Sequence, residues 1–267
     1  MRLDDVRGFV LDVDGTLVHR AGEEVHVQPG AREVLERIRA SGRPFAIFTN
    51  GSHAAPETFA AGLRAVGLDV ADDELLTPLR SVQSYLGRHR RDASVQVFAT
   101  AAAREYLVEA GLRIAAGSES ADVVFVAHAD AVDFEELERA ARAVLAGAPL
   151  LTGSYAAAYA GANGQIICRG AMLTAAIAKA SGARPVIVGK PSEAALETIV
   201  DQLGTRLDEL AVIGDDLGMD VALGRLGGAR TVLVRSGITK LVELDGVADA
   251  DRPDAVVDAI ADLLDWL

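Results

Sequence analysis

The sequence contains few cysteines and few aromatic residues, and both shortages restrict its class. Its one cysteine, Cys168, has no second cysteine with which to form an internal disulfide bond. We therefore expect a reducing, cytoplasmic setting, with Cys168 as a small buried side chain. Aromatic residues make up 4% of the chain, although half of it is hydrophobic. Such a composition, rich in alanine, valine and leucine, is typical of helices packed on a parallel sheet.

Basic residues are also scarce, with 26 Lys and Arg against 39 Asp and Glu and a formal net charge of −13 at pH 7. We expect no nucleic-acid partner, because no basic face is available to neutralise a phosphate backbone. We also expect no membrane span, since the longest uncharged stretch, residues 143–168, is interrupted by glycines and a proline. An acidic protein attracts an anionic substrate well only where it holds a cation locally.

Short apolar runs alternate with amphipathic stretches along most of the chain. This rhythm predicts a doubly wound, Rossmann-like α/β fold with a parallel sheet. The strands expected in this sheet are residues 6–13, 44–50, 184–190, 210–216 and 230–237. The helices expected beside them are residues 30–42, 55–68, 192–204 and 217–228.

The middle of the chain repeats this rhythm without carboxylates at its strand ends. We therefore predict a core domain built from residues 1–76 and 184–267, with a smaller α/β domain of residues 77–183 inserted into it. Strands of the inserted domain are expected at residues 94–100, 121–129 and 149–153, and helices at 101–111 and 133–147.

Polar side chains follow four of the strands predicted for the core. In open α/β sheets, ligands bind beyond the carboxyl ends of the strands, so we expect these side chains to converge. In chain order they are Asp12 and Asp14, Thr49 and Asn50, Lys190, and Asp215 with Asp216 and Asp220.

Each of these residue types has a chemical use. Several carboxylate oxygens together form a site for a hard cation, and Mg²⁺ is the expected occupant. Asp12 can attack phosphorus to form an aspartyl phosphate. Asp14 can protonate the leaving oxygen and then deprotonate the attacking water. Lys190 and Thr49 can bind the phosphoryl oxygens as charge develops on them.

Four motifs in this chain resemble those of the haloacid dehalogenase (HAD) superfamily, in order and at suitable spacing. They are "DVDGT", "FTN", "GKPS" and "GDDLGMD". Residues 28–68 and 164–192 are also similar to the class IIA branch, which includes 4-nitrophenylphosphatases, phosphoglycolate and pyridoxal phosphatases and bacterial nucleotide phosphatases. The resemblance implies a HAD core with a large α/β cap domain, and an Mg²⁺-dependent phosphatase that acts on a small phosphomonoester.

The resemblance also implies roles for the acidic residues. Asp12 would be the nucleophile and a metal ligand, and Asp14 the general acid and base, whose backbone carbonyl also binds the metal. Asp215 would be the acidic metal ligand, with Asp220 behind it or reached through water. Dehalogenases lack a carboxyl group at the position of Asp14, because a halide needs no proton. Asp14 therefore favours hydrolysis of a phosphoester.

The resemblance assigns the phosphate site to uncharged groups and one lysine. Thr49 and the backbone around Asn50 and Gly51 would hold the phosphoryl group, and Lys190 would bridge the nucleophile and the phosphate. Asp216 stands where family members usually carry arginine or asparagine, and we expect it to face solvent.

Residues 150–170 are the least typical part of the predicted cap, which in this family closes over the site and selects the substrate. The candidates for substrate contact are Tyr155, Tyr159 and Arg169 from the cap, with His53 from the core. Sugar phosphates, phosphoglycolate, glycerol phosphate, nucleotides and pyridoxal phosphate all remain open as substrates. Caps of this branch often mediate dimers, so a homodimer through the cap is a further expectation.

Other functions also fit an acidic pocket with a threonine and a lysine. One is a phosphoacceptor signalling domain, although receiver domains are about half this length and lack the inserted unit. Another is a non-catalytic protein that binds a phosphorylated metabolite on the same scaffold. A phosphotransferase is a variant within the enzyme class.

Overall fold

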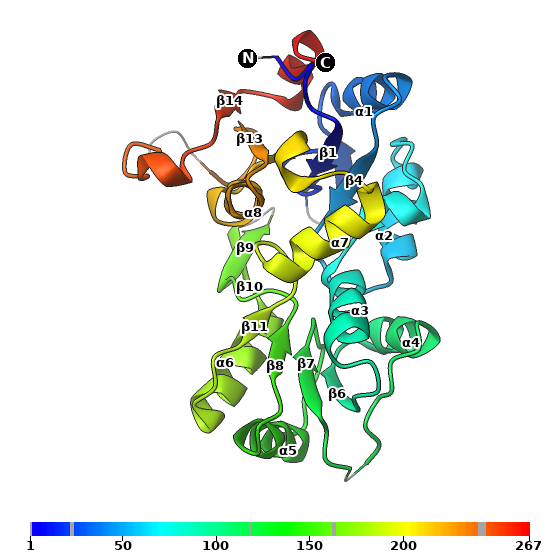
Figure 1. The fold of residues 1–267 in the computed structure, drawn as a ribbon, viewed down its shortest axis with the longest axis vertical. Helices are drawn as coiled ribbons and strands as arrows, with labels where there is room; N and C mark the ends of the chain where they lie inside the picture. Colours follow the sequence, from blue (N-terminus) through cyan, green and yellow to red (C-terminus); the bar gives the residue numbers. More distant parts are fainter. Residues whose placement is uncertain (1, 22–23, 118, 162–163, 240–243) are drawn as a thin grey trace.

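The computed structural model describes residues 2–21, 24–117, 119–161, 164–239 and 244–267. Its larger sheet has six strands, all parallel, in the order β14-β13-β12-β1-β4-β5 (Figure 1). The strands are β1 (Gly8–Leu11), β4 (Phe45–Phe48), β5 (Leu75–Leu76), β12 (Leu210–Gly214), β13 (Arg230–Val234) and β14 (Ala255–Val257).

Helices cover both faces of this sheet, because side chains that alternate along each strand bury themselves on opposite sides. Phe9 and Leu11 of β1 belong to one apolar cluster, while Val10 between them belongs to another. The first cluster includes residues of α1 (Ala31–Ala40), α2 (Pro56–Ala65) and the 3-10 helix η6 (Ile260–Asp265). The second includes residues of α7 (Glu193–Leu203) and α8 (Ala222–Gly227). The predicted doubly wound parallel-sheet fold is thus confirmed.

A second, four-stranded parallel sheet has the order β11-β8-β7-β6 and lies below the first in Figure 1. Apolar clusters again occupy both of its faces. Its strands are β6 (Val95–Phe98), β7 (Val123–Val126), β8 (Leu150–Thr152) and β11 (Val186–Ile187). Its helices are α3 (Pro78–His89), α4 (Ala101–Glu109), α5 (Phe134–Leu145) and α6 (Arg169–Ser181).

One predicted strand belongs to a different sheet from the one we expected. We expected residues 184–190 to form a strand of the larger sheet, but Val186 and Ile187 pair with Leu151 and Thr152 of β8. A two-residue strand with an exposed and a half-buried residue has no buried face that could join the middle of a covered sheet. The predicted boundaries of the two domains stay a prediction.

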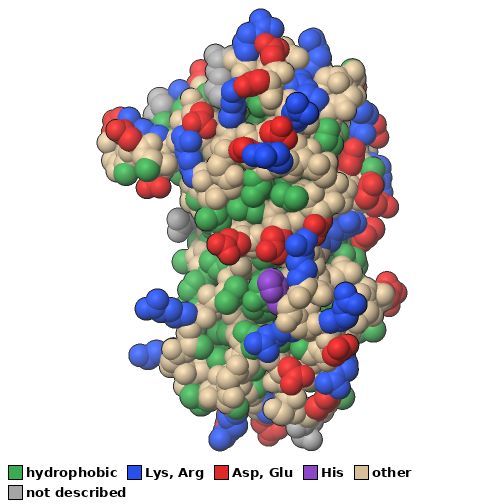
Figure 2. Space-filling model, in the orientation of Figure 1, with side chains coloured by type: hydrophobic (Ala, Val, Ile, Leu, Met, Phe, Trp, Pro, Cys, Tyr) green, Lys and Arg blue, Asp and Glu red, His purple; other side chains and the backbone are tan. Residues whose placement is uncertain are grey.

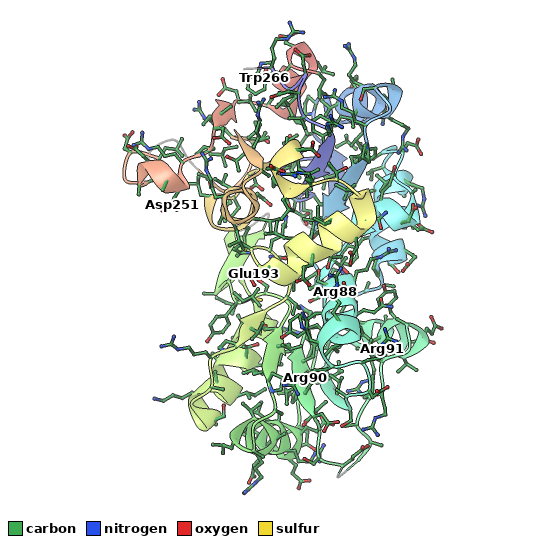
Figure 3. The ribbon with its side chains drawn as sticks, viewed as in Figure 1. Arg88, Arg90, Arg91, Glu193, Asp251 and Trp266 are labelled. Atoms are coloured by element: carbon green, nitrogen blue, oxygen red, sulfur yellow. The ribbon has the colours of Figure 1, made fainter. Side chains whose placement is uncertain are left out.

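Helices α3 and α7 pack against each other where the two units meet. Arg88 of α3 extends toward α7 and forms an ion pair with Asp201 (Figure 3). Ser84 Oγ donates to the same carboxylate at 3.2 Å. These contacts tie the two units together on one side.

Two antiparallel hairpins complete the fold: β2 (Val18–Ala21) with β3 (Glu24–Val27), and β9 (Ala158–Gly161) with β10 (Gly164–Ile167). Among the described residues, no helix has the length and apolar character needed to span a membrane. On the face shown in Figure 2, basic side chains alternate with acidic ones over much of the described surface.

Candidate active site

Three neighbouring parallel strands place the predicted polar residues at one edge of the larger sheet. Asp12 follows β1, Asp215 follows β12 on one side of it, and Thr49 follows β4 on the other. The backbone N–H of Asp12 still donates to the carbonyl of Ile213 at 2.9 Å, so the pairing of the strands extends to the site. Strand order alone therefore brings these three side chains together.

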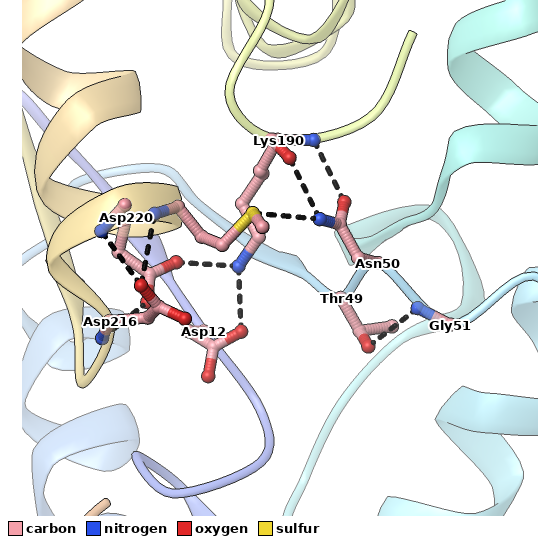
Figure 4. Close-up of polar contacts among 9 residues, drawn as sticks. Asp12, Thr49, Asn50, Gly51, Lys190, Asp216 and Asp220 are labelled. Carbon is pink, nitrogen blue, oxygen red and sulfur yellow. Dashed lines mark hydrogen bonds and ion pairs between the residues drawn. The ribbon is translucent and has the colours of Figure 1, made fainter. Parts of the chain in front are cut away.

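Lys190 reaches the same place from a different element, the connection that leads from β11 back to α7. Its side chain is 3% exposed, and its Nζ donates to Oδ1 of Asp12 and to Oδ1 of Asp220, both at 2.6 Å (Figure 4). The side chain of Asn50 fixes the backbone of Lys190 through two hydrogen bonds of 2.8 Å, one to its carbonyl and one from its N–H. Burial alone would lower the pKa of Lys190, but the charges of Asp12 and Asp220 raise it above its ordinary value.

Three carboxylates meet beside this ammonium. Asp12, Asp215 and Asp220 each offer one oxygen, and the three oxygens lie within 4.8 Å of one another. Burial raises the pKa of Asp12 well above its usual range, and the charge of Lys190 offsets this only in part. Burial, followed by the charge of Asp220, raises the pKa of Asp215 to about 7. The charge of Asp220 thus opposes ionisation of Asp12 and of Asp215 unless a further cation is present.

Two glycines leave room for the Asp215 carboxylate. A Cβ at Gly15 would lie 2.3 Å from Oδ2 of Asp215, and Gly15 also has a φ of +93°, which favours glycine. A Cβ at Gly237 would lie 1.7 Å from the same oxygen. That close approach lets the N–H of Ile238 donate to Asp215 at 2.7 Å. Sequence reasoning missed Gly237 and Ile238, since no local pattern links them to a carboxylate more than twenty residues earlier.

Asp14 lines the same cavity, but it is not one of the three clustered carboxylates and has a partner of its own. Nε of Arg20, in β2, donates to Oδ1 of Asp14 at 2.6 Å, and both side chains are close to half exposed. The hairpin of β2 and β3 folds the chain back so that Arg20 lies over the aspartate six residues earlier. Sequence reasoning also missed Arg20. If a hairpin is assumed after Asp14, the spacing of six residues indicates that Arg20 can contact it.

The residues after β4 form a compact loop. Thr49 is buried, and its Oγ1 accepts a hydrogen bond from the N–H of Gly51 at 3.1 Å. A Cβ at Gly51 would lie 2.8 Å from the ring of Phe59, so glycine allows the loop to pack against α2. Thr49, Asn50 and Gly51 thus line the same cavity as Asp12 and Lys190.

This cavity has a volume of about 390 Å³ and is lined by residues of both units. The second unit is hydrogen-bonded to the loop after β4, since Thr100 Oγ1 donates to the carbonyl of His53 at 2.6 Å. The N–H of His128, after β7, donates to Ser52 Oγ at 3.0 Å. The rings of His53 and His128 both line the cavity, with their centres 6.0 Å apart. The second unit therefore covers the site.

The candidates for substrate contact fall in different places. His53 lines the cavity, whereas Tyr155 and Arg169 are exposed and are not among the described residues that line it. Nη1 of Arg169 lies 3.5 Å from Oδ1 of Asp130. Tyr159 belongs to β9, and its side chain lies outside what the structure describes.

Two expectations about single residues are wrong. Cys168 is half-buried and lines the cavity, so it is not a core side chain. Asp216 does not simply face solvent, because it is half-buried and its Oδ1 accepts from the N–H of Gly218 at 2.7 Å and of Met219 at 3.2 Å. Asp216 thereby caps the π-helical turn η3 (Leu217–Val221), which carries Asp220 into the site.

Comparisons with known proteins match this chain to one family. A model of the haloacid dehalogenase-like hydrolases matches residues 9–113, and a HAD-hydrolase-like model matches residues 187–263. The 5'-nucleotidase YutF of Bacillus subtilis is 25% identical and covers 98% of both chains. The ribonucleotide monophosphatase NagD of Escherichia coli K12 is 27% identical over 97% of this chain and 98% of its own.

Comparison with solved structures indicates the same family. The crystal structure of the 4-nitrophenylphosphatase of Thermotoga maritima has a TM-score of 0.88 and 25% identity, and the match covers 98% of each chain. This chain belongs to the haloacid dehalogenase-like hydrolases, in the branch of NagD and the 4-nitrophenylphosphatases, and is a phosphatase of that family.

Proposed function

We propose that this phosphatase hydrolyses small-molecule phosphomonoesters with Mg²⁺ as cofactor and with Asp12 as a nucleophile that carries the phosphoryl group transiently. The observation that carries the proposal is the convergence of Asp12, Asp215, Asp220 and Lys190 at one edge of the sheet. A lone strand-end aspartate is common, but three clustered carboxylates beside a buried ammonium serve chemistry better than stability, because their burial is unfavourable.

The donor set fits magnesium, since it consists of carboxylate oxygens clustered within 4.8 Å. Asp12 and Asp215 would hold the ion together with the backbone carbonyl of Asp14, and Asp220 would support them. When bound, the ion neutralises negative charge on the phosphate and on the carboxylates around it. The charge of Asp220, which contributes to the raised pKa values of Asp12 and Asp215, supports this assignment, because a bound cation would offset the repulsion between these carboxylates.

In the first step, a carboxylate oxygen of Asp12 attacks phosphorus, and the bond from phosphorus to the leaving oxygen breaks. Asp14 gives its proton to that oxygen, so the product leaves as a neutral alcohol. Lys190, Thr49 and the backbone N–H groups near Gly51 bind the phosphoryl oxygens as the charge shifts.

In the second step, Asp14, now a carboxylate, takes a proton from a water molecule that attacks the phosphorus of the aspartyl phosphate. The bond from phosphorus to Asp12 breaks, which releases inorganic phosphate and restores both carboxyl groups. Arg20 would hold the Asp14 carboxyl group in one orientation through both steps, given their contact of 2.6 Å. The covering unit would keep bulk water away from the intermediate.

The proposal is tested with 4-nitrophenyl phosphate, assayed with Mg²⁺ and with EDTA. We expect turnover that needs the ion and falls by about 10³-fold or more in Asp12→Asn, as for removal of other nucleophiles. Asp73→Asn, at an exposed aspartate, is the matched control and should behave like the native protein. Acid-quenched native protein should also carry label from a ³²P-substrate on Asp12. Full turnover by Asp12→Asn would exclude Asp12 as the nucleophile.

The phosphoacceptor and non-catalytic alternatives are disfavoured because the chain is a phosphatase by family and carries a covered cavity. Sugar phosphates, phosphoglycolate, glycerol phosphate and nucleotides are the substrate classes that we propose to screen. A cytoplasmic setting and a homodimer through the cap stay predictions.

A further inference from the structure

The end of the cavity away from the carboxylate cluster is mainly apolar. This end must hold the alcohol part of the substrate, because Asp12, Thr49 and Lys190 take up the phosphate end. Apolar side chains come from both units, and those outside the carboxylate cluster are Phe59, Val126, Ala156 and Ala158. A charged group placed against such a wall loses hydration without gaining a partner.

The cations that line the cavity are already paired with carboxylates. Among the described lining residues, these cations are Arg20, held at 2.6 Å by Asp14, and Lys190, held by Asp12 and Asp220. Five aspartates line the same cavity: Asp12, Asp14, Asp215, Asp216 and Asp220. An additional negative charge on the substrate would therefore meet an excess of carboxylates.

Ala156 and Ala158 form the part of the cavity wall that we call the cap wall. The sequence around them contains no cation either. Residues 143–168, which include the whole hairpin of β9 and β10, contain no charged residue. The first cation beyond them, Arg169, is exposed and lies 3.5 Å from Asp130. An anionic leaving group would thus find no counter-ion along this wall.

Two imidazole rings provide polar contacts at this end of the cavity. Burial and the nearby His128 and Arg20 lower the pKa of His53, so its ring is neutral at pH 7 and offers one donor and one acceptor. Nε2 of His128 lies 3.6 Å from Oδ1 of Asp130. The neutral imidazole of His53 suits hydroxyl or carbonyl groups better than carboxylates.

We propose that the cavity selects phosphomonoesters whose leaving alcohol carries no negative charge, such as polyol, sugar or nucleoside phosphates, over esters of the same size that carry a carboxylate. The inference rests on the proposed function and specifies the substrate class of the same site. It separates phosphoglycolate from the other candidates.

Two esters of nearly equal size test the proposal on the native protein with Mg²⁺. 2-Hydroxyethyl phosphate has a neutral alcohol, and phosphoglycolate adds a carboxylate. We expect kcat/KM for the neutral ester to exceed that for phosphoglycolate by at least tenfold. A smaller preference, or a reversed one, would overturn the proposal. 4-Nitrophenyl phosphate is assayed in parallel, so that loss of all turnover counts against the proposed function and not against the choice of substrate.

A charge placed on the cap wall gives a second test. Ala156 lines the cavity, whereas the adjacent Ala157 is exposed and is not among its described lining residues. Ala156→Lys should reduce the preference for 2-hydroxyethyl phosphate over phosphoglycolate at least fivefold, and the matched control Ala157→Lys should leave it within twofold of native. Ala158→Lys replaces Ala156→Lys if that variant has a lowered melting temperature. An unchanged preference in a folded cavity variant would show that this wall does not face the leaving group.

Discussion

Replacing Lys190 with methionine tests whether its ammonium group offsets the free-energy cost of burying the neighbouring carboxylates. The Lys190 side chain is 3% exposed, and its partners Asp12 and Asp220 are 12% and 3% exposed. Removing one member of a buried ion pair typically costs about 3–5 kcal/mol, because the remaining charge stays buried without a partner. Methionine keeps most of the side-chain length, so the lost charge dominates over lost packing.

We expect Lys190→Met, in EDTA at pH 8, to melt roughly 6–20 °C below the native protein, since about 1 kcal/mol shifts the melting temperature by about 2–4 °C at this size. The difference should shrink at pH 5, because burial raises the pKa of Asp12 and a proton can then replace the missing ammonium. Thermal melts followed by circular dichroism measure both values.

The matched control is Lys179→Met, since Lys179 is exposed on α6 and the same substitution there removes a solvated charge. It should melt close to the native protein. If Lys190→Met also melts within about 2 °C of native at pH 8, the ion pairs are not what stabilises the site, and the reasoning is refuted.

Three further predictions concern single carboxylates. Asp14→Asn should lower kcat/KM for an alkyl phosphate at least about tenfold more than for 4-nitrophenyl phosphate, because 4-nitrophenolate leaves without a proton; equal losses would contradict its role as the acid. Asp216→Asn should keep activity within a few-fold of native, since an amide oxygen can still accept from Gly218 and Met219; a collapse of Mg²⁺ affinity would show a direct role. Without metal, the pKa of Asp215 rises from 3.8 to about 7 on folding, so its contribution to stability is present below pH 3.8 and is lost as the pH rises through 7. Saturating Mg²⁺, which needs the carboxylate, should therefore raise the melting temperature more at pH 8 than at pH 5, and equal gains by calorimetry would contradict this.

Local patterns were enough to predict much of this fold. The buried run ending at Leu11 and the run ending at Gly214 are continuous apolar segments bounded by polar residues, and such segments form covered parallel strands wherever they pair. The helix predicted over residues 30–42 is α1, and the one over 192–204 is α7, because glycines stop both patterns. The residues directly after these strands could therefore be placed at one edge from the sequence.

The sequence by itself determined which residues end strands and hence that Asp12, Thr49 and Asp215 meet. Tertiary structure decided the rest: that β11 joins the second sheet, that Arg20 folds back onto Asp14, and that Gly237 lets Ile238 reach Asp215. The sequence of a two-residue apolar run does not indicate which strand it pairs with. The sequence of a loop likewise does not indicate which carboxylate the loop contacts. These contacts depend on packing between segments far apart in the chain, which periodicity within any one segment does not encode.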